Sequence, residues 1–278
     1  MSEKKSLLLE SELRDLLEKS SLKFWEDESI DSATEVAQSI WAFGDEMSSL
    51  FKVECKTNNL TNGCAEGCAY CCHQNIQISI FEAVGILKWI KSNFNDVKKS
   101  EILKRAEAIC KSGVEDEGDS QRWSRREACP CLDIHTNKCM IYPVRPIECR
   151  TTLIYDKTSC KNSYEDTNSS GISVSDKEVI HVALPKTESV EVNSVSEYIL
   201  SCLFDVNLMK WFQKLYKNDE MTGSVVEDAH KIMAPFDFEL SKVLKNGLKS
   251  NSDAVIDSLV NFDSNALYSC QKQTDSDL

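Results

Sequence analysis

Four cysteines and a histidine crowd into ten consecutive residues of this chain. The stretch reads Cys64-Ala-Glu-Gly-Cys68-Ala-Tyr-Cys71-Cys72-His73. Thiolates and imidazoles are ligands for zinc, and thiolates also hold iron–sulfur clusters. Two residues separate Cys68 from Cys71, and a tight turn of that length aims both sulfurs at one ion. The residue types and their spacing therefore indicate a metal site.

A second group of cysteines follows in residues 129–160. Its members are Cys129, Cys131, Cys139, Cys149 and Cys160. They lie far enough along the chain to close a metal site from another loop. Together the two blocks hold more thiols than the four that a tetrahedral ion takes. Either one centre has spare thiols, or two metals are bound.

We expect eight cysteines to carry the metal, which is either zinc or iron, with an iron–sulfur cluster as one form of the iron alternative. They are Cys64, Cys68, Cys71, Cys72, Cys129, Cys139, Cys149 and Cys160. His73 is either a fifth ligand, because imidazole suits both metals, or a hydrogen-bonded histidine beside the site. Arg145 and Arg150 flank Cys149, and we expect them either to donate to sulfur and compensate charge or to be solvated.

Composition limits the class of protein. The chain has 278 residues, a net charge of -13 and a pI of about 4.9. Such an acidic chain is a poor binder of nucleic acid or anionic membranes, which attract basic surfaces. No apolar run approaches the about 20 residues that cross a bilayer, and the N-terminus turns acidic too early for a secretory signal. We therefore expect a cytoplasmic protein with no nucleic-acid partner and no membrane partner.

The cytoplasmic assignment decides how the thirteen cysteines are interpreted. Disulfides are rare in a reducing compartment, where clustered cysteines are more often metal ligands or catalytic groups. The alternative is a disulfide-stapled secreted domain. Such scaffolds are usually short, and an odd number of cysteines fits complete pairing poorly.

Helices must position the two blocks, and apolar residues at helical spacing predict them on both sides. The predicted ranges are 6–19, 33–51, 81–94, 97–111, 194–215, 224–233, 237–248 and 253–261. Serine followed three residues later by glutamate predicts a capping box at Ser32, Ser79 and Ser194.

Non-helical segments are predicted between these helices. A short strand is expected at residues 76–78, and the β-branched runs 151–155 and 178–184 are expected to pair as strands. Residues 113–127 are mostly charged and predict an exposed connector or a partly helical lid. The second cysteine block contains the X-Pro turns Tyr142-Pro143 and Arg145-Pro146 and is predicted to be a loop with one helical turn. Residues 162–170 are predicted as loop.

The predicted fold class is mainly α, with a helical frame around a small cysteine-rich metal-binding subdomain and one or two short strand pairs. We divide the chain into four parts by pattern. They are N-terminal helices in 1–54, a cysteine-cluster metal-binding domain in 55–185, a C-terminal helical region in 186–262, and a disordered tail in 263–278.

Both cysteine blocks resemble the YkgJ-type cysteine-cluster family, also described as the "putative zinc- or iron-chelating" CxxCxxCC domain. The resemblance rests on Gly67-Cys68-Ala-Tyr-Cys71-Cys72-His73, on Cys129-Pro-x-Leu132-Asp133, and on Cys139-x-Ile141-Tyr142-x3-Pro146-x2-Cys149-Arg150. Cys160 matches a trailing cysteine found in part of the family. The resemblance covers residues 64–160 and implies metal chelation by these cysteines, without a settled activity. A related branch contains flagellin lysine N-methylases associated with an iron–sulfur centre.

Two features depart from that family's pattern. The first block begins with Cys64-x3-Cys68, a common variant of the two-residue spacing. Cys131 stands where the family usually has an apolar residue, so it is an extra ligand, a redox thiol or a core substitution.

Three functions compete for this sequence, and whether it is an enzyme stays open. The first is metal binding by a zinc or iron chelator. The second is an iron–sulfur-dependent oxidoreductase or a protein N-methyltransferase-like enzyme. The third is a radical-SAM enzyme, because Cys64-x3-Cys68-x-Tyr70-Cys71 fits that signature. Radical-SAM enzymes need alternating strands and helices downstream, whereas this sequence predicts helices and a second cysteine block.

Overall fold

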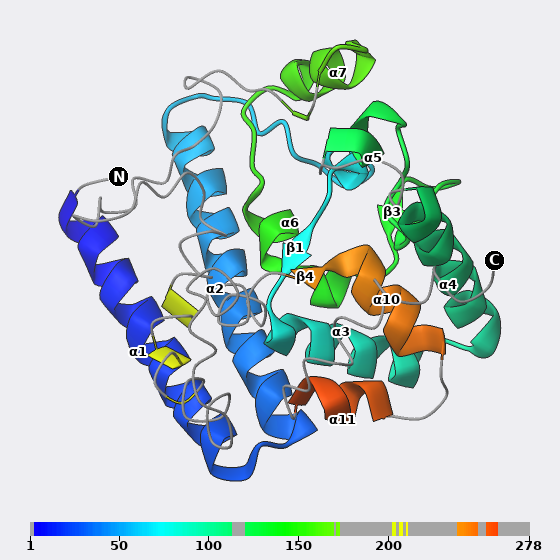
Figure 1. Cartoon of the computed structure of the whole chain (residues 1–278). Coiled ribbons are helices and arrows are strands. Elements are labelled where there is room, and N and C mark those ends of the chain that lie inside the picture. Colours follow the sequence, from blue (N-terminus) through cyan, green and yellow to red (C-terminus); the bar gives the residue numbers. More distant parts are fainter. Residues whose placement is uncertain are drawn as a thin grey trace, which may run out of the picture.

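A computed structural model describes most of the N-terminal half of the chain and several later segments. The described residues are 3–112, 120–169, 171–172, 202–203, 206–207, 210, 238–249 and 254–260. Over these residues the protein is mainly helical with two short antiparallel strand pairs, which confirms the predicted fold class. Helices α1 (Glu3–Asp27) and α2 (Ile30–Thr57) pack side by side along one edge of the molecule (Figure 1).

The turn between α1 and α2 places the start of the second helix three residues earlier than predicted. Ser29 is the N-cap, and its hydroxyl accepts a hydrogen bond from the Ser32 backbone N–H at 3.1 Å. The Ser32 hydroxyl returns the bond by accepting from the Ser29 N–H at 3.2 Å. The capping box therefore joins Ser29 to Ser32, and the predicted pairing of Ser32 with Glu35 was wrong. Serine at the third helical position takes the role that glutamate usually has.

The hydrophobic core lies between α2 and the helices on its inner side. Helix α3 (Ile80–Asn93) packs on α2 and is buried on most of its surface. Helices α10 (Leu240–Lys249) and α11 (Ala254–Val260) cover the other side of α3, and α10 also packs on α4 (Asp96–Ser112). The predictions of helices in 81–94, 97–111, 237–248 and 253–261 are confirmed to within a few residues.

The structure has two short strand pairs, one between segments distant in sequence and one within a hairpin. Strand β1 (Gln77–Ile78) pairs with β4 (Phe238–Glu239), which occupies the start of the predicted 237–248 helix. Strands β2 (Leu132–Asp133) and β3 (Lys138–Cys139) form a hairpin within the second cysteine block. The predicted strand at 151–155 was wrong, apart from a single bridge at Ile154, and its expected partner 178–184 lies outside the described residues.

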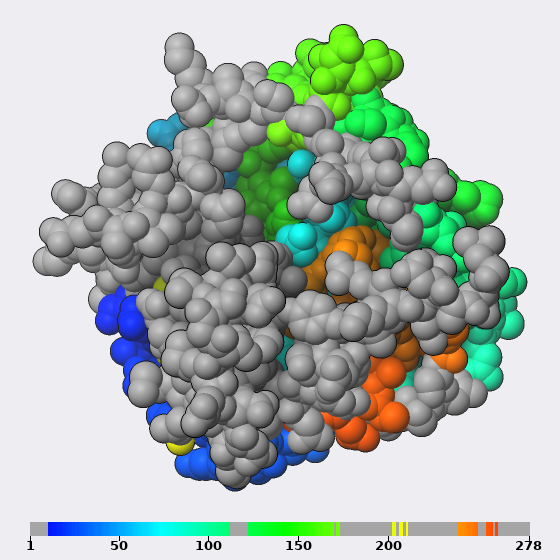
Figure 2. All heavy atoms as spheres, in the orientation of Figure 1, coloured from blue at the N-terminus to red at the C-terminus, as the bar shows by residue number. Residues whose placement is uncertain are grey.

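Short helical turns carry the cysteine region. They are η1 (Tyr70–His73), α5 (Ser120–Ser124), η2 (Tyr142–Val144), α6 (Ile147–Thr151) and α7 (Lys157–Glu165). Helix α7 replaces part of the loop predicted for 162–170, because Asp156 caps it by accepting from the Thr158 N–H at 2.8 Å. In the space-filling view α7 forms the upper edge of the molecule, next to α5 (Figure 2).

Several predictions fall on residues that the structure does not describe. They are the capping box at Ser194, most of the 194–215 helix, the 224–233 helix and the tail from 263. None of the described helices is long and apolar enough to cross a membrane.

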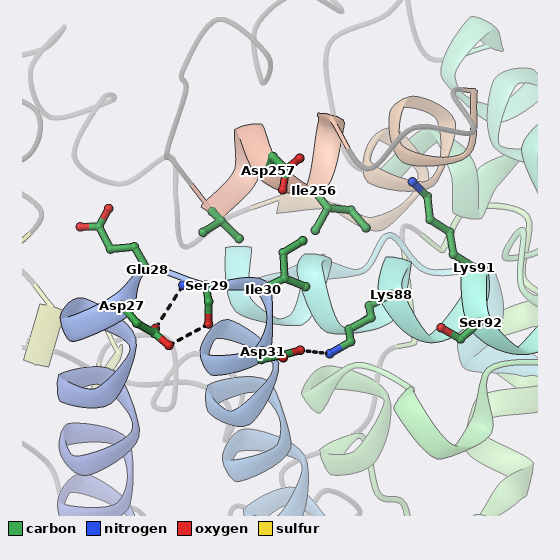
Figure 3. A pocket seen from close by; sticks show the side chains of 11 residues that line it. Asp27, Glu28, Ser29, Ile30, Asp31, Lys88, Lys91, Ser92, Ile256 and Asp257 are labelled. Carbon is green, nitrogen blue, oxygen red and sulfur yellow. Dashed lines mark hydrogen bonds and ion pairs between the residues drawn. The ribbon is translucent and has the colours of Figure 1, made fainter.

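A pocket opens at the end of the molecule away from α5 and α7 (Figure 3). The α1–α2 turn, α3 and α11 line it. Its charges are engaged locally, since Lys88 pairs with Asp31 at 2.5 Å and the Ser29 hydroxyl donates to Asp27 at 2.9 Å. The pocket therefore belongs to the capping of α2, and it is remote from the cysteine blocks.

A buried carboxyl group joins the helical frame to the cysteine region. Glu82 caps α3 by accepting from the Ser79 backbone N–H at 3.1 Å, as the predicted capping box requires. Its other oxygen accepts from the Ile147 N–H at 2.8 Å and from the Trp41 indole N–H at 3.3 Å. Burial raises the pKa of Glu82, although these donors favour the ionised form. One side chain therefore connects α2, α3 and the first residue of α6.

Replacing Glu82 tests this connection. Glu82→Gln keeps the shape of the side chain but turns an amide NH2 group toward a backbone N–H donor, that of Ser79 or that of Ile147, so it should destabilise the fold nearly as much as Glu82→Ala. We expect a loss of about 2–4 kcal/mol from the free energy of unfolding, measured by urea denaturation. The matched control is Glu35→Gln, which breaks an exposed ion pair with Lys23 and should cost less than about 1 kcal/mol. Equal losses in the two variants would contradict the assigned role.

Candidate metal centre

The first cysteine block lies against the start of α7. The Gly63 N–H donates to the Ile154 carbonyl at 2.9 Å, and the Ile154 N–H donates to the Cys64 sulfur at 3.2 Å. A side chain at Gly63 would come within 2.5 Å of the Lys157 nitrogen, so glycine permits this close approach. Cys64 is thereby brought next to α7, which carries Cys160.

Aromatic packing holds the rest of the first block on the same helix. The Tyr164 ring of α7 lies 5.4 Å from the Tyr70 ring and 4.8 Å from the His73 ring. These contacts fix η1 against α7, and Cys71 and Cys72 lie within η1. The Cys160 thiol is close enough to Cys64, Cys68 and Cys71 to interact with each electrostatically.

Two hydrogen bonds to one carbonyl join the two cysteine blocks. The Cys72 carbonyl accepts from the Cys129 backbone N–H at 2.7 Å and from the Arg122 guanidinium at 2.8 Å. Arg122 also donates to the Glu127 carbonyl at 3.1 Å. Arg122 and Trp123 are 4% and 1% exposed, so the prediction of an exposed connector was wrong at these positions. A tryptophan within a charged run was the signal that this segment turns inward.

The other cysteines of the second block are positioned by α4 and α6. In the β2–β3 hairpin Cys139 pairs with Leu132, whose carbonyl accepts from Arg105 of α4. Cys149 lies in α6, which Glu82 holds by the Ile147 N–H. The neighbouring Glu148 carboxylate accepts from the Gln77 N–H of β1 at 2.9 Å. The helical frame thus fixes the backbone on either side of each thiol.

The described cysteines are all free thiols, twelve in number. Removal from water raises the pKa of Cys64 and of Cys139 to about 11 and that of Cys160 to about 12. A hydrogen bond from Cys131, helped by the charge of Arg122, lowers the pKa of Cys129 to about 6. A hydrogen bond from Cys72 lowers the pKa of Cys71 in the same way. Most of these thiols therefore keep their protons at neutral pH until a cation replaces them.

The thiols gather without yet surrounding a common point. Within the described part of the chain, no three Cys, His, Asp or Glu side chains enclose a position for a metal ion. A cysteine sulfur changes direction by rotation about χ1 alone, so forming a site requires rotamer changes and small loop adjustments. This behaviour is expected of a thiolate site, since such sites form together with metal binding.

A buried arginine nitrogen without a hydrogen-bond partner in the described part of the chain supports the fit to an anionic metal centre. The buried Nε of Arg145 has no hydrogen-bond partner, although its guanidinium stacks on Tyr142 at 4.1 Å. The Arg145 charge also acts on Cys71 and Cys139, one thiol from each block. Thiolates bound to a metal are the acceptors that this N–H group lacks. The donor set and its surroundings therefore fit zinc or iron held by thiolates.

Two residues with an open role have other partners. The Nδ1 of His73 lies 3.1 Å from the Ala69 carbonyl, so this nitrogen carries the proton, and Nε2 accepts from the Tyr164 hydroxyl at 3.5 Å. His73 is therefore the hydrogen-bonded alternative. Arg150 neither contacts sulfur nor is solvated: it is 3% exposed and pairs with Asp45 of α2 at 2.6 Å.

Two cysteines outside the predicted ligand set, Cys131 and Cys55, are buried close to it. Cys131 is 1% exposed, and its thiol forms a hydrogen bond with the Cys129 thiol. It therefore lies among the clustered thiols rather than apart from them. Cys55, at the end of α2, is buried and interacts electrostatically with Cys64.

These features define a cysteine-rich metal-binding domain set on a helical frame. Residues 63–169 match the family model CxxCxxCC, described as "Putative zinc- or iron-chelating domain". This match is the family that the sequence resembled, and all eight predicted ligands lie within it. Neither a curated protein nor a solved structure matches the chain. The match supports metal binding by these residues.

Arg122 offers a test of how the two blocks are joined. Arg122→Ala removes the bonds to the Cys72 and Glu127 carbonyls from a buried site, so we expect a loss of about 2–3 kcal/mol of unfolding free energy. The measurement is urea denaturation of the metal-free protein. The control is Arg125→Ala on the same turn, whose ion pair with Glu127 is partly exposed and should contribute less than about 1 kcal/mol. An Arg122 variant as stable as the control would refute the assignment.

Proposed function

We propose that this protein is a cytoplasmic metal-binding protein that chelates zinc or iron through the thiolates of its two cysteine blocks. The ligands are those predicted from the sequence: Cys64, Cys68, Cys71, Cys72, Cys129, Cys139, Cys149 and Cys160. The observation that carries the proposal is that mostly desolvated thiols of both blocks lie near enough to interact with one another. The Arg145 charge acts on one thiol of each block, and its Nε lacks a hydrogen-bond partner among the described residues.

The chain's own groups prepare this region for a cation. Cys71 and Cys129 have lowered pKa values because neighbouring thiols donate hydrogen bonds to them. They are the first thiolates available to an entering ion, and the ion then displaces protons from the others to solvent. A bound zinc or iron supplies the positive charge that holds the thiolates together. Arg145 and Arg122 offset the negative charge that remains.

Zinc and iron share this donor set, and the proposal includes an iron–sulfur cluster as the form in which iron is held. Thiolates are soft ligands that suit zinc and iron–sulfur clusters alike. The two outcomes lead to different chemistry, because zinc has no redox states under biological conditions and a cluster carries electrons.

The radical-SAM alternative is disfavoured by the surroundings of the first block. That chemistry needs an iron with a free coordination position above three cysteines. Here the Cys160 thiol lies beside Cys64, Cys68 and Cys71, and it offers a fourth thiolate to the same centre. The geometry therefore favours a closed thiolate site over one with an open position.

Metal content and the visible absorption spectrum test the proposal on protein purified without oxygen. A colourless protein containing zinc supports the chelating or structural form. A brown protein containing iron and sulfide supports an iron–sulfur centre. Protein with neither metal, before and after reconstitution with zinc or with iron and sulfide, would refute the function.

Single substitutions test the ligands. Cys68→Ser and Cys149→Ser should lower the metal content and the melting temperature, since site formation and folding are coupled. With metal at about a thousand times its dissociation constant, complete loss of binding removes about 4 kcal/mol of stability. The matched control is Cys110→Ser on α4, outside both blocks, which should keep full metal content. Full metal content in both ligand variants would contradict the assignment.

A further inference from the structure

The 3-10 helix η1 lies at the boundary between two groups of thiols. A 3-10 helix has 3.0 residues per turn, so successive side chains leave its backbone about 120° apart. Cys71 and Cys72 are successive residues of η1, and they therefore leave it in different directions. The segments packed around η1 also differ: α7 lies against its rings, while the Cys129 N–H binds the Cys72 carbonyl.

The first group of thiols is held between the first block and α7. The bonds of Gly63 and Cys64 to Ile154 clamp the start of the block beside α7. Cys160 lies in α7 and acts electrostatically on Cys64 and on the rest of the first block. Among the strongest interactions of Cys64 and Cys68, the thiol partners come from this side only, with Cys55 as the further neighbour.

The second group is held by the hairpin and α6. Cys72 interacts with Cys129 and Cys149, and Cys139 interacts with Cys129. The backbone hydrogen bonds support the same grouping. The Cys129 N–H donates to the Cys72 carbonyl, and the N–H of Met140, the neighbour of Cys139, donates to the Cys131 carbonyl at 2.8 Å. Cys71 borders both groups: its thiol accepts a hydrogen bond from Cys72, and it also interacts with Cys129, Cys139 and Cys149.

We propose, on the basis of the proposed function, that η1 separates two metal centres rather than contributing to one. The first centre takes four thiolates, from Cys64, Cys68, Cys71 and Cys160. The second takes four thiolates, from Cys72, Cys129, Cys139 and Cys149. Cys71 belongs to the first centre because its two-residue spacing from Cys68 aims both sulfurs at one ion, and the second centre is complete without it.

Proton and charge balance are the same at each centre. Four thiolates bind one divalent ion, each thiol that is still protonated releases its proton to solvent, and the site keeps a net charge of about -2. Each centre has a cation of its own, Lys157 near Cys68 and Arg122 near Cys129. Arg145 acts on Cys71 and Cys139, one ligand of each centre, so its unpartnered Nε lies where two anionic sites meet.

Cobalt(II) titration of the reduced, metal-free full chain tests the proposal, with the thiolate-to-cobalt charge-transfer absorption as the readout. The unaltered protein should saturate at two equivalents. Cys160→Ala and Cys149→Ala should each saturate at one equivalent, and the double variant should bind none tightly. Iron or zinc content of the protein as purified should fall by half in each single variant.

The control variant is Cys55→Ala, which removes a thiol next to Cys64 but outside both sets. It should keep two equivalents. Far-UV circular dichroism checks that each variant is folded, and Cys68→Ala with Cys139→Ala forms a second pair that repeats the comparison if the first pair fails to fold. Cys71→Ala should remove one equivalent, as Cys160→Ala does.

The outcomes separate this inference from the proposed function. Saturation of the unaltered protein at one equivalent, or loss of both equivalents from either single variant, would overturn the two-centre arrangement while metal binding itself stands. Loss of both equivalents from Cys71→Ala would show a shared centre and would also overturn it. An unaltered protein that binds no cobalt, zinc or iron would remove the proposed function and this inference together.

Discussion

The buried carboxyl group of Glu82 determines how the irregular cysteine region attaches to the helical frame. A carboxyl group removed from water is tolerated only where donors surround it, and here they come from α2, the start of α3 and the start of α6. The same group that caps α3 therefore fixes the helical turn that carries Cys149. At Gly44, close contact with Ile147 and Arg150 lets that turn lie directly on α2. The frame thus sets the position of the second block before any metal binds.

Crowded thiols make the region dependent on something beyond packing. Burial favours protonated sulfur, yet hydrogen bonds from neighbouring thiols and the charges of Arg122 and Arg145 favour thiolate at Cys129 and Cys71. Most of the thiols therefore keep their protons, while the pKa values of Cys129 and Cys71 are lowered toward the thiolate form. A divalent ion removes the conflict because it stabilises every thiolate at once. Metal binding and local folding are consequently one process here, and the thiols need not be arranged around a point in advance.

The sequence predicted the fold class, the capping box of Ser79 and Glu82, and the ligand-rich segment, because each depends on local spacing. It could not predict that Glu82 also binds the Ile147 N–H, since that bond spans 65 positions in the chain. Arg122 was misjudged for a related reason: a charged residue is buried only when distant carbonyls, here that of Cys72, receive it. Helix α2 began earlier than predicted because serine replaced glutamate in its capping box. Long-range partners of polar groups thus account for the errors at Glu82 and Arg122, whereas the error at α2 came from a local cap.

The number of thiolates around a metal decides whether it has a coordination position open for catalysis. A thiolate centre used in catalysis by zinc or by an iron–sulfur cluster keeps a coordination position open for water or substrate, whereas a closed four-thiolate centre does not. In the proposed arrangement Cys160 gives the first centre its fourth thiolate, and Cys72 of the first block gives the second centre its fourth. A site of this composition binds metal firmly and exchanges ligands only by giving up a cysteine. Storage, structural stabilisation and electron transfer are compatible with such a centre, and Lewis-acid catalysis at the metal requires one of its thiolates to leave first.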